Sequence, residues 1–389
     1  MNWRYRHSVL ALCTLAFAAT MLARLVISPV VPDVTDAFGV STGAVGLALS
    51  GMWAAYALTQ FPSGVLGDRF GERRVVLAAV GVTAVASLLL AGAPSFAVFA
   101  LTTVFLGAGA GLHYSVATTL LTKEFDDIGS AIGVHVAGGP LAGLVAPVVA
   151  TAVAARYDWR AALAVGAVTA VPVFLTFAWR VDATPPERPD ERMRDRMALA
   201  PLAELLSRPP IAFTTVLSLL GAFCWQATAS FLPTFLVVFR DQSQTTAGLL
   251  FSAYFVVNGL AQPTMGWVSD RVGRDWTATG TMGLGVVGYG LLVAGPRAAL
   301  VPAIVCAGVA MTWGSPLQSR YFDLFAEGES AAAFGLVRTA YMVLGATGSV
   351  VTGVLADALG WRVAYGFLVV VTGVGFALLV ANRAFDLGL

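Results

Sequence analysis

Long apolar segments separated by short polar turns follow one another along the whole chain of 389 residues. Most of these segments have twenty or more residues, the length a helix needs to cross a lipid bilayer, whereas barrel strands alternate over about ten residues. Because backbone groups in lipid must be hydrogen-bonded within the chain, we interpret the segments as helices. The pattern predicts an all-α membrane protein with twelve transmembrane helices, at residues 8–31, 44–66, 75–92, 95–121, 129–155, 160–179, 211–238, 245–267, 277–294, 299–321, 331–357 and 362–381.

The second half of the chain repeats landmarks of the first at a constant spacing. Gly64 and Gly266 lie 202 residues apart, and the same spacing relates Gln60 to Gln262 and the Trp-Arg pair at 159–160 to that at 361–362. Constant spacing across several landmarks indicates a duplicated ancestral half. We therefore expect a six-helix half over residues 1–180, a cytoplasmic linker over 181–210 with a short interfacial helix near 198–206, and a second six-helix half over 211–389.

A charged turn follows the second predicted helix of each half. The first copy, residues 64–74, reads Gly-Val-Leu-Gly-Asp-Arg-Phe-Gly-Glu-Arg-Arg, and a looser copy occupies 266–274. The turn resembles the loop 2–3 signature of the major facilitator superfamily. The resemblance implies two pseudo-symmetric six-helix halves, transport by alternating access and no enzymatic activity.

The resemblance also implies a gate on the inner side of the membrane. In the superfamily the Asp of this turn faces the positive N-terminus of a helix in the opposite half, which would make Asp68 and Asp270 latches. The alternative is that the charges only orient the helices in the membrane. The candidate gate residues are Gly64, Asp68, Arg69, Gly71, Arg73, Arg74, Gly266, Asp270, Arg271 and Gly273.

Composition excludes several other classes of protein. Charged residues make up 12% and hydrophobic residues 58% of the chain, which suits lipid as the solvent. The net charge of +1 provides no strong field for nucleic acid. The three cysteines lie in separate apolar segments, and Gly-x-Gly-x-x-Gly at 283–288 lies within a predicted helix, where small residues serve packing. We expect no metal, no cofactor and a monomer in the bilayer.

The distribution of basic residues among the loops predicts how the protein is oriented in the membrane. By our assignment, sixteen lie on one set of loops and five on the other, which places the first set and both termini in the cytoplasm. The first apolar run has no small-residue cleavage site after it, so we interpret it as a retained helix of a plasma-membrane protein.

Arg24 lies inside the first predicted helix, where a charge is costly and needs a cavity or a partner. Thr20, Arg24 and Ser28 are four residues apart and form one polar stripe. The repeat places Gln226 and Ser230 at the matching positions of the seventh helix. Two polar faces at symmetry-related sites are typical of a central substrate site, and Arg24 predicts that the substrate is an anion.

A narrower resemblance concerns helices 1 and 2. Residues 24–32 (Arg-Leu-Val-Ile-Ser-Pro-Val-Val-Pro) and 56–64 (Tyr-Ala-Leu-Thr-Gln-Phe-Pro-Ser-Gly) look like the anion:cation symporter branch, in which the helix 1 Arg binds a substrate carboxylate. Three positions depart from the family pattern: Ala23 replaces an Asp, Thr103 replaces the helix 4 Arg, and Ala110 occupies the position of a proton-coupling acid. The usual proton relay is therefore missing.

His113 and His135 are the candidates to replace that relay, because imidazole titrates near physiological pH. The alternative is that each is a neutral histidine hydrogen-bonded between helices. Polar faces on helices 2 and 8 either line the cavity or bond neighbouring helices, and Arg338 is either a second anion contact or part of the gate. The further substrate-site candidates are Tyr56, Gln60, Asn258 and Arg338.

The sequence thus predicts a secondary active transporter that moves a small organic anion, with coupling to H+ left open. Gly138-Gly139-Pro140 resembles part of an antiporter motif, so efflux of a drug-like compound or metabolite is the first alternative. A membrane sensor without transport is the second.

Overall fold

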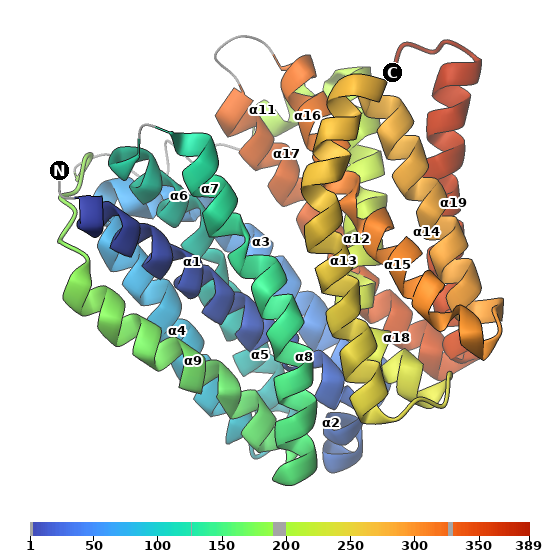
Figure 1. The fold of residues 1–389 in the computed structure, drawn as a ribbon, viewed down its shortest axis with the longest axis horizontal. Helices are drawn as coiled ribbons and strands as arrows, with labels where there is room; N and C mark the ends of the chain where they lie inside the picture. Colours follow the sequence, from blue (N-terminus) through green and yellow to red (C-terminus); the bar gives the residue numbers. More distant parts are fainter. Residues whose placement is uncertain (1–2, 126, 190–199, 326–329) are drawn as a thin grey trace. The chain divides into compact units, whose positions relative to one another are not determined.

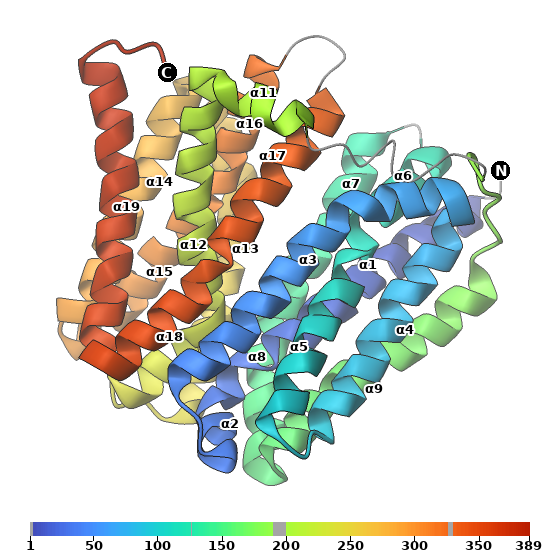
Figure 2. The same cartoon turned by 180° about the vertical axis from the view of Figure 1, so that it is seen from behind.

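The computed structural model describes residues 3–125, 127–189, 200–325 and 330–389, and every regular element in them is a helix (Figures 1 and 2). The chain divides into two compact units. The first comprises residues 1–40 and 51–198, and the second comprises 41–50 and 199–389. The prediction of an all-α fold is confirmed.

The first unit is a bundle around α1, which packs against α8 and α9, while α4 packs against α5 and α9. Its helices are α1 (Trp3–Leu25), the 3-10 helix η1 (Ser28–Val30), α2 (Val31–Phe38), α3 (Thr42–Phe70), α4 (Glu72–Ala91), α5 (Phe96–Gly111), α6 (His113–Glu124), α7 (Ile128–Val136), α8 (Gly138–Arg156) and α9 (Trp159–Arg180).

The second unit is a bundle around α12, which packs against α13, α17, α18 and α19. Its helices are α11 (Ala200–Ser207), α12 (Pro209–Val238), α13 (Gln244–Val272), α14 (Arg274–Ala294), η2 (Arg297–Ala299), α15 (Leu300–Ala310), η3 (Met311–Trp313), α16 (Gly314–Leu324), α17 (Ser330–Gly345), α18 (Thr347–Leu359) and α19 (Trp361–Ala384).

The sequence repeat is also a repeat of helices. α3 and α13 begin and end at positions 202 residues apart, and the starts of α4 and α14 keep the same spacing. Gly71 and Gly273 cap α4 and α14 with φ of 86° and 106°, values that L side chains rarely adopt. Gly71 is constrained twice, because a Cβ there would lie 2.1 Å from the Thr184 carbonyl oxygen. The glycines of the charged turns are thus needed for the sharp entry into the third helix.

Four predicted helices are interrupted. The span predicted over 95–121 breaks between α5 and α6, and the span over 129–155 breaks at Ala137 between α7 and α8. The spans over 299–321 and 331–357 break at η3 and at Ala346. α1 ends at Leu25 and is followed by η1 and α2 rather than continuing to residue 31. Short apolar breaks of this kind carry no hydropathy signal, which is why the sequence did not predict them.

Ten helical segments of the described chain are long and apolar enough to cross a membrane. The other two predicted spans correspond to α3 and α13, with 29 residues each, or about 44 Å at 1.5 Å per residue. They are long enough to span, but they carry the charged turns and the polar faces. Large apolar side chains such as Leu101, Val168 and Val301 lie exposed on the helix surfaces, which suits contact with lipid.

The start of the linker is attached to the first unit rather than free in solvent. The backbone N–H groups of Asp182 and Arg188 donate to the Tyr5 hydroxyl and the Asp68 carbonyl, at 3.0 and 2.9 Å. Glu187 forms an ion pair with Lys123 at 2.6 Å. Further along, α11 confirms the short helix expected near 198–206, of which residues 198 and 199 lie outside the described residues. Most of residues 182–189 are nonetheless exposed, so this part of the linker lies on the surface of the first unit.

The second unit includes the first residues of α3, whose N-terminus is capped by Asp357 of α18. The Asp357 carboxylate accepts from the backbone N–H groups of Thr42 and Gly43 at 3.1 and 2.6 Å. The Ser50 hydroxyl donates to the Ala346 carbonyl at 2.6 Å, at the break between α17 and α18. An acid at a helix N-terminus therefore does occur in this protein, at a residue that sequence analysis did not select.

Candidate functional site

Arg24 lies in the last turn of α1, with only 2% of the residue exposed. Its Nε donates to the Thr20 carbonyl at 3.1 Å, and its Nη2 lies 3.3 Å from the Met21 sulfur. A cation at a helix C-terminus is favoured by the helix dipole, which lowers the cost of burying it. Burial excludes the possibility that Arg24 extends to a lipid headgroup.

Two aromatic rings of α3 cover the guanidinium. The Arg24 Cζ lies 4.0 Å from the ring centroid of Tyr56 and 5.0 Å from that of Trp53, and the two rings meet edge to face. Cation–π contact stabilises a desolvated cation and holds the guanidinium plane in one orientation. A ligand must therefore approach the guanidinium along its edge.

One edge of the guanidinium remains available. Within the described residues, the Arg24 Nη1 is buried without a hydrogen-bond partner, and Arg24 forms no ion pair with a carboxylate. Thr20 and Ser28, the other members of the polar stripe, are also buried, and the Thr20 hydroxyl donates to the Phe17 carbonyl at 2.9 Å. The arrangement can bind an anion through Nη1 at the end of the guanidinium fork.

The structure brings the two candidate histidines together. His113 begins α6 and His135 lies in the last turn of α7, so each sits beside one of the helix breaks. Their ring centroids are 5.4 Å apart, and the ring of Phe17 lies 6.0 Å from the first and 5.3 Å from the second. Both are fully buried, and none of their four ring nitrogens has a hydrogen-bond partner in the described part of the chain. The Cys13 carbonyl of α1 lies near both rings, as the alternative of a histidine hydrogen-bonded between helices requires.

The second unit places its predicted residues differently. Gln226, the counterpart of Arg24, donates to the Met342 carbonyl of α17 at 3.1 Å. Ser230 shares a hydrogen bond of 2.7 Å with Ser349 of α18. These contacts join α12 to the two segments of a broken helix. The buried Gln226 Oε1 has no partner within the described residues, so part of this amide remains free for a ligand.

The other substrate-site candidates are Asn258, Gln60 and Arg338. Asn258 donates to the Gly308 carbonyl at 3.3 Å, which joins α13 to α15. Gln60 is buried on the same helix as Trp53 and Tyr56, and Arg338 is half-buried on α17. The site around Arg24 is thus the part of the predicted set in which a charged group is desolvated and incompletely paired.

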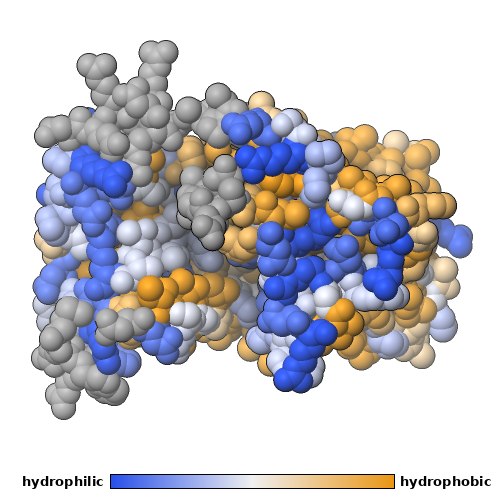
Figure 3. All heavy atoms as spheres, turned by 90° about the horizontal axis from the view of Figure 1, so that it is seen from above, coloured by the Kyte–Doolittle hydropathy of each residue, from blue (hydrophilic) through white to orange (hydrophobic). Residues whose placement is uncertain are grey.

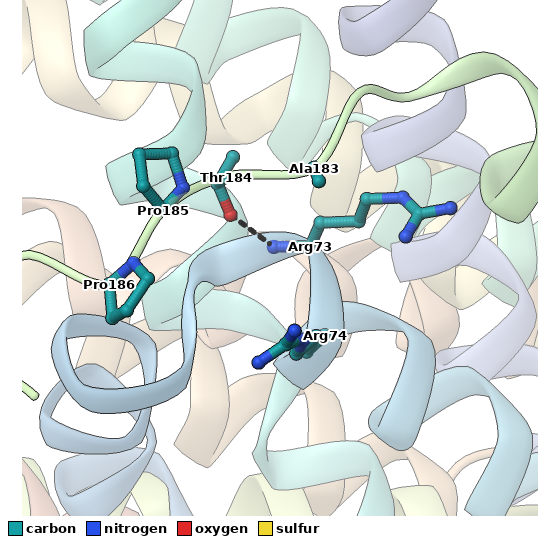
Figure 4. Close-up of a pocket in the computed structure, with 6 residues that line it drawn as sticks. All are labelled: Arg73, Arg74, Ala183, Thr184, Pro185 and Pro186. Atoms are coloured by element: carbon teal, nitrogen blue, oxygen red, sulfur yellow. Dashed lines mark hydrogen bonds between the residues drawn. The ribbon is translucent and has the colours of Figure 1, made fainter.

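The two charged turns differ in their contacts. In the second unit Asp270 forms an ion pair with Arg274 one helical turn later. In the first unit a pocket of about 270 Å³ is lined by Arg73, Arg74 and linker residues 183–186, and the Arg73 N–H donates to the Thr184 hydroxyl at 3.0 Å (Figure 4). The two Arg side chains point in different directions, so the pocket does not converge on one ligand. The view from above in Figure 3 shows hydrophilic side chains interspersed with apolar ones.

Two ion pairs near these turns, each with one buried partner, were not predicted from the sequence. Glu72 at the start of α4 is 1% exposed and pairs with Lys123, while Asp275 at the start of α14 pairs with Arg320 at 2.8 Å. Both basic residues were assigned only to topology. The signal that could have identified the pairs is their similar placement in the two halves, each acid opening the third helix and each cation near the end of the fourth.

Comparison with known proteins agrees with this architecture. The sequence model of the Major Facilitator Superfamily matches residues 13–243 and 240–386, so the chain belongs to this family. It is similar to a probable sulfoacetate transporter of Cupriavidus necator (29% identity over 42% of this chain and 39% of that protein) and to a probable anion transporter of Oryza sativa chloroplasts (23% over 95% and 67%). The chain therefore covers well under half of the first relative's length.

The fold also matches a solved transporter structure. A bacterial homologue of the human lysosomal transporter Spinster, in an inward-facing conformation, superposes with a TM-score of 0.85 over 99% of this chain and 98% of that one, at 16% identity. Such low identity supports the fold alone. The chain is thus an integral membrane protein of a transporter superfamily, and its members are not enzymes.

Proposed function

We propose that the protein is a secondary active transporter for a small organic anion, which it binds through Arg24. The observation that carries the proposal is the buried guanidinium that lacks a carboxylate partner within the described residues and has one nitrogen free. An uncompensated charge in a membrane helix is costly, and a bound anion would neutralise it. The names of the two relatives, a sulfoacetate transporter and an anion transporter, support the same ligand class.

The transport cycle would be alternating access around this central site. Thr20, Ser28, Tyr56 and Gln60 would shape the site in the first unit, with Gln226, Ser230, Asn258 and Arg338 in the second. Asp68 and Asp270 would latch the inner gate, as the charged turns predict. The free energy for uphill movement would come from a coupled ion, for which H+ is the candidate.

Uptake into proteoliposomes tests the proposal, with sulfoacetate, glucuronate and nitrate as probes and a pH gradient applied or absent. Arg24→Ala should abolish uptake of an accepted probe. Arg24→Lys should weaken it strongly, since an ammonium cannot reproduce the guanidinium fork. Arg180→Ala is the matched control: it removes an Arg that also stacks on an aromatic ring, Trp179 at 4.3 Å, but at an exposed helix end.

Three outcomes would contradict the proposal. Uptake by Arg24→Ala at the parental rate would remove Arg24 from the site. Transport of neutral or cationic compounds only would favour the efflux alternative. Specific binding without any transport would favour a sensor.

The orientation proposal places both termini in the cytoplasm of a plasma-membrane protein, because the loops on that side carry most of the Arg residues. Cysteines introduced at Glu187 and at Asp241, in a Cys306→Ser background, provide the test. An impermeant thiol reagent added to intact cells should label residue 241 and spare residue 187. The opposite labelling pattern would reverse the proposed topology.

A further inference from the structure

The most unusual polar cluster outside the anion site is the pair of buried histidines in the first unit. Four imidazole nitrogens without hydrogen-bond partners are expensive in an apolar interior, because each buried polar atom loses its hydration. Two neutral imidazoles side by side each keep one N–H donor and one acceptor. The pair therefore has a built-in place for one more proton, which either ring can take.

The surroundings of the pair favour one proton over two. The groups that bear on the imidazoles are the Cys13 carbonyl and the Arg24 guanidinium from α1 and the rings of Phe17 and Tyr114. No carboxylate acts on either imidazole in the described residues. The Cys13 carbonyl can accept from a protonated ring, but nothing compensates a second positive charge on a neighbouring ring.

The pair and the anion site share a helix. Phe17, which contacts both imidazoles, and Arg24 are seven residues apart on α1, about two helical turns or about 10 Å of rise. The Arg24 charge is one of the influences on His113, after burial, the neighbouring His135 and the Cys13 carbonyl. A positive guanidinium opposes protonation of the pair through the low-dielectric interior, and an anion bound to Arg24 would cancel that opposition.

From this geometry we infer that His113 and His135 form a single-proton site that is charge-linked to Arg24, so that one proton and one anion bind cooperatively. This rests on the proposed anion site and specifies its coupling. The step is an acid–base one: a proton from water binds an imidazole nitrogen lone pair, no covalent bond between heavy atoms changes, and the proton is released when the anion leaves. By reciprocity, the proton strengthens anion binding by the same factor.

The test is proton uptake by purified protein in weakly buffered solution, followed with a pH indicator while sulfoacetate or glucuronate is added. The parent should take up about one proton for each anion bound and bind the anion at least about fivefold more tightly below the pH at which the pair takes up its proton than above it. The His113→Gln and His135→Gln variants should lose most of the uptake, and the double variant all of it, while anion binding persists and no longer depends on pH. His7→Gln, which changes the third histidine of the chain, should behave as the parent.

A ligand-free measurement keeps the inference testable if neither probe binds. Arg24→Gln removes the charge that a bound anion would neutralise, so its histidine pair should take up its proton at a higher pH than in the parent. Infrared titration of the imidazoles, with the double histidine variant as the blank, measures this. Anion binding without proton uptake, proton uptake that survives in the double variant, or identical titration of Arg24→Gln and the parent would each overturn the inference. Absence of anion binding together with the shifted titration would instead reject the anion proposal and leave the proton site standing.

Discussion

The two units share a skeleton but differ in the chemistry of their polar sites. α3 and α13 match residue for residue in extent, and both units join the start of the third helix of the repeat to the fourth by an ion pair. At the matching position of α1 and α12, however, the first unit has the incompletely paired Arg24 and the second has Gln226, which bonds a neighbouring helix. His113 likewise corresponds to Ser315, which donates to the Gln262 carbonyl at 3.3 Å.

This comparison indicates that the two halves share their helix packing but not the chemistry of their polar residues. The buried Arg24, His113 and His135, to which we assign a ligand and a proton, lie in the first unit. The polar groups at the equivalent positions of the second unit mainly make interhelical hydrogen bonds. The variants below test this contrast, each paired with a comparison variant.

The largest effect on stability is expected from Lys123→Met. It leaves the Glu72 carboxylate, 1% exposed, buried without its cation, which should cost about 3 kcal/mol of unfolding free energy. Asp275→Asn in the second unit should cost less than about 1 kcal/mol, because Asp275 is 37% exposed and Arg320 keeps the Pro210 carbonyl as an acceptor. Denaturant titration in mixed micelles compares the two. Equal losses would show that the two ion pairs are equivalent.

Arg24→Gln makes the first unit resemble the second at this position. Loss of a charge-assisted contact in a desolvated site should weaken anion binding by at least about 2 kcal/mol, roughly thirtyfold. Gln226→Ala should weaken anion binding less than Arg24→Gln does, because it removes a neutral amide whose NH2 group already donates to the Met342 carbonyl. Binding of the accepted probe to purified protein is the measurement. A larger loss in Gln226→Ala than in Arg24→Gln would reverse the assignment of the site.

Asp357→Asn and Asp270→Asn compare two acids near helix ends. Asp357 accepts two backbone N–H groups at the start of α3, so its loss should destabilise the second unit by about 1 kcal/mol. The Asp270 side chain is 66% exposed and pairs with Arg274 of the next turn, so its loss should cost less than about 0.5 kcal/mol. Thermal unfolding ranks the two variants. A greater loss at Asp270 would point to contacts beyond that pair, as a gate requires.

The smallest effect is expected from Met21→Leu. The Met21 sulfur lies against the Arg24 Nη2, and Phe223 occupies the matching position of the second unit. Removing the weakly accepting Met21 sulfur leaves the Arg24 Nη2 N–H groups available to the anion, so anion affinity should rise about two- to threefold. Isothermal titration with the accepted probe can resolve the change, and Phe223→Leu should leave affinity unaltered. Weaker binding by Met21→Leu would mean that the sulfur positions the guanidinium.

Much of the architecture could be predicted from the chain. Hydropathy predicted the spans as helices, because backbone groups in lipid must be hydrogen-bonded within the chain. The 202-residue spacing predicted helices that begin at matching positions in the two halves. The cost of a charge in a membrane helix was enough to select Arg24. The aromatic contact was not predicted: Tyr56 was selected as a substrate-site candidate, but not as a ring on which Arg24 stacks.

Only the tertiary structure decided which polar residues meet. His113 and His135 belong to different helices, and their contact depends on breaks at Leu112 and Ala137 that no local pattern predicts. Glu72 and Lys123 are likewise brought together by packing across 51 residues of chain. The sequence by itself determined that lipid surrounds the helices, where most helices lie, that the two halves repeat, and that the charge inside helix 1, at Arg24, is positive. These features follow from residue type and spacing. Whether each buried polar group is satisfied or left open depends on its neighbours from other helices, and only the packed units supply those.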